Sequence, residues 1–378
     1  QKFPEENMFI YFWILLLSLF WAYLLEQVRA LEADTFRIGR FSVKKTLACR
    51  GALVLCALPS AVLSGFRYAV GVDYFYTYVP LYQKIASGMS LREVGTEPGY
   101  YFLNKLIILL GGGTVWVFLI TSLMIAGLFF LAFYQQSESF VLSVAMFFAA
   151  ESYFVSLMYV RQFIAAGFVI FGFRYIREKK FWKYALCIGA AFLFHTSAVI
   201  MLPLYVLCLL PIHPLFLAGG IAALSLLHDV LMRLLQSMAS LTPYGAYWGS
   251  IFQQGFRFYG IAFFKYAILF AVAAFFYKKN KKDRFYLFCL NTMALLVYIA
   301  CNFDILPQTD RICWYLELVV LLLVPMLVRR CSVPWLKPVL LVGLLSVFGT
   351  VTVSDVFVNG AHGVVPYRFV FSPDAVFL

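Results

Sequence analysis

The sequence predicts an all-α protein that crosses a membrane many times. Of the 378 residues, 63% are hydrophobic and only 13% are charged. A soluble domain keeps a mixed surface and cannot hide that much apolar area. Apolar runs of 17 residues or more recur from end to end, which is the length that a helix needs to cross a bilayer. The α-helix fits such runs because it satisfies its own backbone hydrogen bonds in lipid, and the alternating pattern of an outer-membrane barrel is absent.

We expect about twelve crossings within a single membrane domain that covers residues 1–378. The expected spans are 8–25, 47–65, 114–134, 139–158, 160–177, 183–195, 196–211, 213–228, 258–277, 285–303, 312–328 and 336–353. The apolar segment 100–111 is too short for a hydrocarbon core of about 30 Å. Pro98 and Gly99 precede this segment and three glycines at 111–113 follow it, so we expect a half-helix or a surface helix there.

The distribution of lysine and arginine predicts the orientation. Basic residues cluster in four loops on one side of this topology, and the positive-inside rule assigns that side to the cytoplasm. These loops are Arg29–Lys45, Arg174–Lys183, Lys278–Arg284 and Arg329–Lys337. The net charge of +12 is therefore a signal of membrane orientation and not of nucleic-acid binding. The main periplasmic loops are then 66–113, 229–257 and 304–311.

Three arginines fall on the predicted outer side. Arg67 lies in the first outer loop, Arg161 opens a helix with Gln162 beside it, and Arg311 lies just before another helix. Together they suit a pyrophosphate, whose charge needs several fixed cations. Taken singly, an arginine at a helix end commonly reaches lipid phosphate instead. Because nucleotide sugars are cytoplasmic, a cationic site on the outer face favours a lipid-linked sugar as donor.

Candidate proton acceptors gather on the same predicted side. Asp73 and Glu97 lie in the first outer loop, and His195 sits at an outer turn with apolar neighbours. A carboxylate or an imidazole can accept the proton of an attacking hydroxyl. The alternative readings are solvated loop acids and a hydrogen-bonded core histidine. Glu151 lies inside an apolar run, where an acid is costly and usually paired, so we expect an ion pair with an arginine.

Aromatic side chains crowd two outer segments, the first outer loop around Tyr74 and the run PYGAYWGSIFQQGFRFYG at 243–260. They fit either an interfacial aromatic belt or a platform on which sugar faces pack. The sequence has no phosphate-binding glycine loop, no GxSxG and no HExxH. No cysteine and histidine spacing fits a metal site, so we expect neither a metal nor another cofactor.

Four segments in order resemble the EpsG family of Wzy-type polysaccharide polymerases. They read FRYAVGVDYFYTY, TEPGYYFLNKLI, YVRQFIAAGFVIFGFRYIREKKFWK and AFLFHTSAVIMLPLY, and a late VVPYRF extends the resemblance over about 65–368. The implied motif positions are Arg67, Gly71, Asp73, Glu97, Pro98, Gly99, Tyr100, Arg161, Gln162, His195 and Ser197.

The resemblance implies a bacterial inner-membrane enzyme that acts at the periplasmic face. Its substrates would be undecaprenyl-pyrophosphate-linked oligosaccharides embedded among membrane lipids, and a flippase and a chain-length regulator would be its protein partners. The expected catalytic residues are Asp73, as the base, and His195 and Glu97 as its rivals. The expected substrate-binding residues are Arg67, Arg161, Arg311, Tyr100, Gln162 and Tyr74.

Two other functions compete with this interpretation. A flippase for lipid-linked oligosaccharides would place its charges in a central cavity that is reached from both sides. A membrane acyltransferase would use His195 as a base and would need a path for an acyl donor from the cytoplasm. A base on the first outer loop is also the arrangement of C-type membrane glycosyltransferases, which is an analogy of architecture only.

Overall fold

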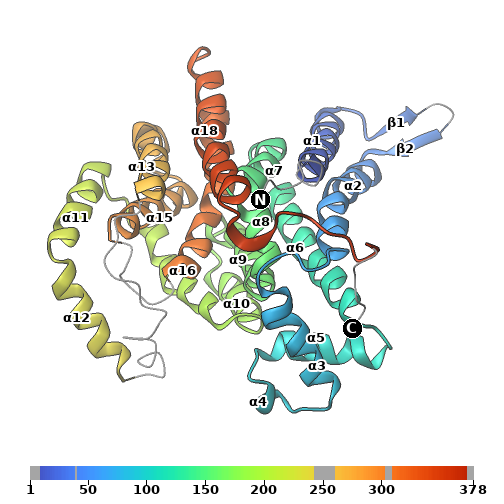
Figure 1. Ribbon diagram of the computed structural model, residues 1–378. Helices are drawn as coiled ribbons and strands as arrows, with labels where there is room; N and C mark the ends of the chain where they lie inside the picture. The colour runs from blue at the N-terminus through green and yellow to red at the C-terminus, as the bar shows by residue number, and fades with distance from the viewer. Residues whose placement is uncertain (1–8, 39–40, 242–259, 303–308, 373–378) are drawn as a thin grey trace.

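The computed structural model describes residues 9–38, 41–241, 260–302 and 309–372, and these form an all-α fold with one small hairpin (Figure 1). The hairpin pairs β1 (Thr35–Ile38) with β2 (Phe41–Lys44) in antiparallel register, within the first predicted basic loop. The all-α prediction is confirmed for this part of the chain.

Six helical segments of the described residues are long and apolar enough to cross a membrane. They are α1 (Phe9–Ala30), α2 (Lys45–Gly65), α6 (Thr114–Gln136), α15 (Arg284–Cys301), α16 (Thr309–Leu316) continuing into α17 (Val320–Arg330), and α18 (Leu336–Thr352) with its extension to Val358. Two bent pairs raise the number to eight if each is one span. These pairs are α7 (Phe140–Ala149) with α8 (Ser152–Met158), and α11 (Pro214–Leu226) with α12 (His228–Ala239).

Several predicted crossings are not full-length apolar helices. Length and composition alone therefore support six to eight spans among the described residues and not the expected twelve. α10 (Phe181–Phe192) has 12 residues, or about 18 Å at 1.5 Å per residue. The next stretch forms two 3-10 helices, Thr196–Met201 and Pro203–Leu209. α13 (Gly260–Phe275) has 16 residues, and α9 (Val160–Arg177) carries three arginines.

The segment 66–113, predicted as the first outer loop, is itself helical. It contains a π-helical turn (Tyr74–Tyr78), α3 (Val79–Ala86), α4 (Leu91–Val94) and α5 (Pro98–Leu109). The predicted short helix at 100–111 is confirmed as α5, which has 12 residues and begins at the expected proline. These helices lie at the bottom of Figure 1, and the β1–β2 hairpin lies at its upper right.

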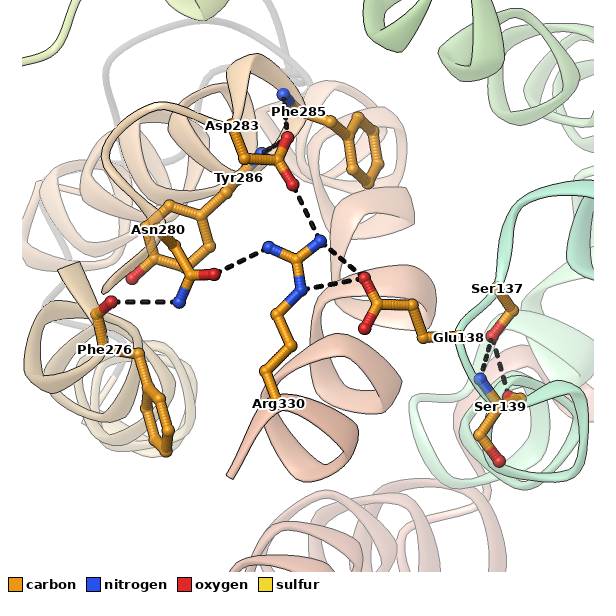
Figure 2. A network of polar contacts seen from close by, with 9 residues as sticks. All are labelled: Ser137, Glu138, Ser139, Phe276, Asn280, Asp283, Phe285, Tyr286 and Arg330. Carbon is orange, nitrogen blue, oxygen red and sulfur yellow. Dashed lines mark hydrogen bonds and ion pairs between the residues drawn. The ribbon is translucent and has the colours of Figure 1, made fainter. Parts of the chain in front are cut away.

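Two of the predicted cytoplasmic loops and the segment around Glu138 meet at Arg330 (Figure 2). The Arg330 guanidinium donates to Glu138 at 2.5 and 2.9 Å, to Asp283 at 2.7 Å and to Asn280 at 2.7 Å. The short α14 (Tyr277–Asn280) carries this asparagine. The structure thus brings together the loops at 278–284 and 329–337, which the charge pattern placed on one side, and adds Glu138 to them.

Some helices are enclosed by the rest of the protein, and others lie at its surface. In α15, 83% of the residues are buried inside the protein. The same share holds for the most apolar stretch of Thr309–Arg330. The share is only 28% for α1, which therefore presents most of its surface outward. α9 packs against α6 and α10, and α16 packs against α15. The polar end of α16 is consequently held by neighbours on several sides.

Candidate functional site

The Glu97 carboxylate joins two segments that are far away in the sequence. Its Oε2 atom lies 2.5 Å from Nη1 of Arg161, and its Oε1 atom lies 2.9 Å from Nδ1 of His195. Glu97 directly precedes α5 with extended backbone, and the proline that follows it suits the first helical position. The Thr96 hydroxyl lies 2.9 Å from the same Arg161 nitrogen. One acid therefore fixes both the guanidinium and the imidazole.

A close backbone contact holds this arrangement in place. The Gly99 N–H donates to the Leu193 carbonyl at 2.7 Å. A Cβ atom at Gly99 would lie 2.7 Å from the same carbonyl oxygen, which no ordinary side chain tolerates. Leu193 comes two residues before His195. The glycine of EPGY therefore lets the loop of Glu97 approach the turn of His195.

A second glycine positions Asp73. Gly71 has a φ of +90°, a conformation that L side chains rarely adopt, and its N–H donates to the Gly363 carbonyl at 2.9 Å. Its missing Cβ would collide with the Leu157 carbonyl at the end of α8. The start of the first outer loop is thereby pinned between α8 and the C-terminal segment. Asp73 follows two residues later, within electrostatic reach of Arg311 and Arg161.

The two loop carboxyls differ in their acidity. Burial raises the pKa of Asp73, and the Thr77 side chain and the two arginine charges offset this only in part. Burial also acts to raise the pKa of Glu97, but the hydrogen bond with His195 and the charge of Arg161 outweigh it and lower the pKa to about 2. Carboxyls whose environments push their pKa values apart usually have different roles. Asp73 is the stronger proton acceptor, and Glu97 is a permanent anion.

Arg311 completes the cluster from the other side. Its guanidinium lies 5.5 Å from the centre of the Tyr159 ring, and its carbonyl accepts from Nε2 of Gln162 at 2.6 Å. Within the described part of the chain Arg311 makes no ion pair. The buried Nε atom of Arg161 also has no hydrogen-bond partner there. Both guanidiniums therefore have donors without a protein partner in this part of the chain.

The structure gives Arg67 a role other than the expected one. This side chain is only 1% exposed, and its three nitrogens bind the carbonyls of Val70, Leu157 and Ser64. Its guanidinium also lies 4.5 Å from the centre of the Phe118 ring. Because every nitrogen is directed at protein, the geometry favours a scaffold role over contact with a pyrophosphate. The same burial that hides the charge makes it a cross-link between α2, α8 and the first outer loop.

Two of the predicted sugar contacts are also buried. The Tyr74 ring is 4% exposed and stacks on Phe118 with centroids 4.4 Å apart. Tyr100 is fully buried, and its ring centre lies 5.9 Å from the Arg161 guanidinium. Both rings pack inside the protein next to residues of the site and are not exposed to a ligand. The aromatic run at 243–259 lies outside the described residues.

Sequence reasoning missed some residues and mispaired another. Thr96 stands just before EPGY and Tyr159 just before the RQ pair, so adjacency to the motifs was their only signal. We expected Glu151 to pair with an arginine. Its partner in the structure is His362 instead, whose Nε2 atom lies 3.7 Å from the Glu151 carboxylate. Among the described residues, no group of three His, Cys, Asp or Glu side chains is placed to hold a metal ion.

Comparison with known proteins agrees with the motif pattern. A model of the EpsG family matches residues 52–369, a span that includes every site residue from Asp73 to Arg311. No curated protein and no solved structure matches the chain. Because the matched span covers most of the 378 residues, the chain belongs to the EpsG family, the family of Wzy-type polysaccharide polymerase-like proteins.

Proposed function

We propose that this protein is a membrane glycosyltransferase that polymerises lipid-linked oligosaccharides. The observation that carries the proposal is the Glu97 carboxylate held between Arg161 and His195, with Asp73 and Arg311 beside it. The donor is a saccharide chain on undecaprenyl pyrophosphate. The acceptor is a sugar hydroxyl of an incoming lipid-linked unit. The site faces the periplasm in the inner membrane of a bacterium, and a flippase and a chain-length regulator act beside it.

One displacement accounts for the reaction. The acceptor hydroxyl oxygen attacks the anomeric carbon of the donor sugar, and a new glycosidic bond forms. The bond from that carbon to the pyrophosphate oxygen breaks, and undecaprenyl pyrophosphate leaves with the electron pair. The hydroxyl proton passes to a base of the protein. Because the pyrophosphate is already an activated leaving group, the step needs no nucleotide and no metal.

Arg161 and Arg311 stabilise the leaving group in this mechanism. Negative charge grows on the pyrophosphate in the transition state, and fixed cations near that charge lower the barrier. Glu97 and Thr96 hold the Arg161 guanidinium, so little reorganisation is needed when the charge develops. Arg311 is positioned by Gln162 through its backbone and by the Tyr159 ring. Two planar guanidiniums can bind phosphate oxygens in pairs of hydrogen bonds.

Asp73 is the proposed base, because its raised pKa makes it the better proton acceptor of the two loop acids. Glu97 is unsuited to that role, since its pKa of about 2 leaves it a very weak base and both of its oxygens are engaged. His195 is the rival base. Its Nδ1 atom contacts Glu97, which leaves Nε2 for a substrate proton. In the Asp73 mechanism, His195 orients the acceptor sugar.

The same geometry bears on the two competing functions. A flippase needs polar groups along a path between both faces, whereas the cluster combines the first outer loop with helix ends on that same predicted side. An acyltransferase that uses His195 would need no second cation for a pyrophosphate. Both arginines would then be free of function in catalysis. The paired guanidiniums therefore favour glycosyl transfer.

The test is reconstitution of the purified protein with a synthetic undecaprenyl-pyrophosphate-linked repeat unit. A ladder of products separated by one repeat unit supports the polymerase. Substrate that crosses the bilayer unchanged identifies a flippase, and acylated sugar formed only with an added acyl donor identifies an acyltransferase. Either of the last two outcomes overturns the proposal.

A further inference from the structure

The segment from α16 to Glu317 presents two different faces. Arg311 belongs to the reaction cluster, the group formed by Asp73, Glu97, Arg161, His195 and Arg311. Four residues later, Tyr315 lies within electrostatic reach of Glu97 and Arg311. The residues at 310, 314 and 317 follow a second helical stripe with steps of four and three. All three line a separate cavity. One short helix thus forms a wall between the reaction cluster and this cavity.

The cavity has a volume of about 340 Å³, within the range of about 300–1,000 Å³ that is typical of small-molecule sites. Four carboxylates line it, from Glu151, Asp310, Glu317 and Asp355. They face one lysine and one histidine. Lys265 lies 2.9 Å from Glu317, and His362 lies 3.7 Å from Glu151. Acids remain in excess over bases among the described lining residues, so the cavity is a region of negative potential.

Two buried polar atoms of the lining have no protein partner in the described part of the chain. They are Oε2 of Glu317 and Nε1 of Trp314. The other Glu317 oxygen already binds Lys265 and the Tyr266 hydroxyl, and the whole residue is only 4% exposed. A buried polar atom without a partner costs about 1–3 kcal/mol. The Glu317 oxygen can accept a hydrogen bond, and the Trp314 nitrogen can donate one. A ligand that both donates and accepts, as a hydroxyl group does, would satisfy both atoms.

We infer that this cavity is a saccharide subsite for a sugar that offers hydroxyl or ammonium donors and carries no carboxylate. The sugar hydroxyls donate to Glu317 and Asp355, and one sugar oxygen accepts from Nε1 of Trp314. The indole and Tyr266 supply the apolar surface on which a sugar face packs. The excess of carboxylates repels a uronic acid, so the cavity selects through repulsion as well as attraction.

The assignment of this sugar to the lipid-linked repeat unit rests on the proposed function. Asp310 lines the cavity, and the next residue, Arg311, belongs to the reaction cluster. Tyr159 contacts both, since its hydroxyl lies beside Asp310 and its ring lies 5.5 Å from the Arg311 guanidinium. A sugar in the cavity would therefore lie directly beside the reacting end of the chain. The subsite would fix which repeat units the enzyme accepts.

The direct test is sugar binding without turnover. The full chain in lipid nanodiscs is titrated with glucose, glucosamine and glucuronate, and binding is followed by saturation-transfer NMR. We expect wild-type protein to bind glucose and glucosamine, and to bind glucuronate at least tenfold more weakly. Trp314→Phe and Asp355→Asn should each weaken the binding of the first two sugars by about tenfold. The first removes a hydrogen-bond donor, and the second replaces a charged acceptor with a weaker neutral one. Trp335→Phe is the matched control, since Trp335 is 70% exposed and lies outside the cavity lining.

Three results would overturn the subsite. They are equal binding of glucuronate, unchanged binding in the Trp314→Phe protein, and no binding of any of the three sugars to wild-type protein. The Trp314→Phe protein alone decides the location if Asp355→Asn does not fold. Because no glycosyl transfer is measured, failure of this test leaves the polymerase assay unaffected. Failure of polymerisation, in turn, leaves the binding result standing.

Discussion

The Glu97 carboxylate contacts Nδ1 of His195 at 2.9 Å, although 98 residues separate the two in the sequence. This contact fixes the ring orientation and leaves Nε2 as the nitrogen available to a ligand. The Gly99 contact with Leu193 keeps the two loops at this distance. Glu97 therefore acts through His195 and Arg161, which makes it a positioning residue.

Glu97→Gln should lower turnover on the order of 100-fold, because the amide cannot hold both partners and a displacement near 1 Å suffices for such a loss. Folded protein should persist. The pKa of about 2 is lower than that of an unfolded glutamate, so the ionised form contributes stability above about pH 4.3, and this is lost as the pH falls through about 2. The advantage in melting temperature of wild type over Glu97→Gln should thus shrink as the pH falls below about 4.3. An advantage that stays unchanged between about pH 5 and about pH 3 would contradict the ion-pair role.

Arg161→Lys should restore little activity relative to Arg161→Ala. Lysine keeps the charge but loses the planar fork that contacts Glu97 and a phosphate oxygen together. We expect the alanine protein to lose about 100-fold or more in turnover with lipid-linked substrate. Arg92→Ala is the matched control, because Arg92 is an exposed arginine of the same outer loop. Full activity of the lysine protein would show that paired hydrogen bonds to the pyrophosphate are not needed.

Asp73→Asn should reduce turnover by about 10²–10⁴-fold while substrate binding is retained. Because burial raises the pKa of Asp73, its ionisation opposes folding as the pH rises through that value, and the asparagine protein should be at least as stable at pH 7. If Asp73 is the base, the loss of wild-type turnover at acid pH follows the raised pKa of this carboxyl and has no counterpart in Asp73→Asn, whose amide does not titrate. The measurement is turnover against pH for wild type, Asp73→Asn and His195→Ala. Near wild-type turnover of Asp73→Asn would transfer the role to His195.

Arg67→Ala should remove folded protein from the membrane. The substitution leaves three buried carbonyls of Val70, Leu157 and Ser64 without their donor, which costs about 3 kcal/mol or more. Arg50→Ala, an exposed arginine of α2, the helix that ends two residues before Arg67, should have no effect on protein level. Protein abundance and melting temperature are compared in both variants. A stable and inactive Arg67→Ala protein would contradict the scaffold role and favour contact between Arg67 and the pyrophosphate.

The sequence could predict helices and the grouping of charges but not the depth of each side chain. Apolar length and basic loops are local signals, and they predicted the helical class, the short α5 and the face shared by Arg330 and Asp283. The motifs placed Glu97 and His195 in one site, but composition could not distinguish an arginine that faces a ligand from one that faces carbonyls. That distinction depends on packing, and Arg67 shows it.

The sequence motifs could not predict the cavity beside α16, because the residues that line it are far apart in the sequence. Glu151, Lys265 and Glu317 come from three separate segments of the chain, and each alone is a single charge in an apolar run. Only tertiary contacts bring them to one place. The pairing of Glu151 with His362 likewise depends on the C-terminal segment, which returns to α8 at the end of the chain.

The last prediction concerns the orientation of the whole protein. Arg330 ties the basic loop at 278–284 to the loop at 329–337, so a cysteine at Lys281 should share the cytoplasmic side with Arg330. A cysteine at Lys84, in α3, should lie on the opposite side with the reaction cluster. We expect a membrane-impermeant maleimide to label Lys84→Cys in intact cells and Lys281→Cys only after lysis. The eight native cysteines are buried or half-buried, so wild-type protein gives the background. Labelling of Lys281→Cys in intact cells would invert the topology and place the cluster in the cytoplasm, where a lipid-linked donor would no longer be favoured over a nucleotide sugar.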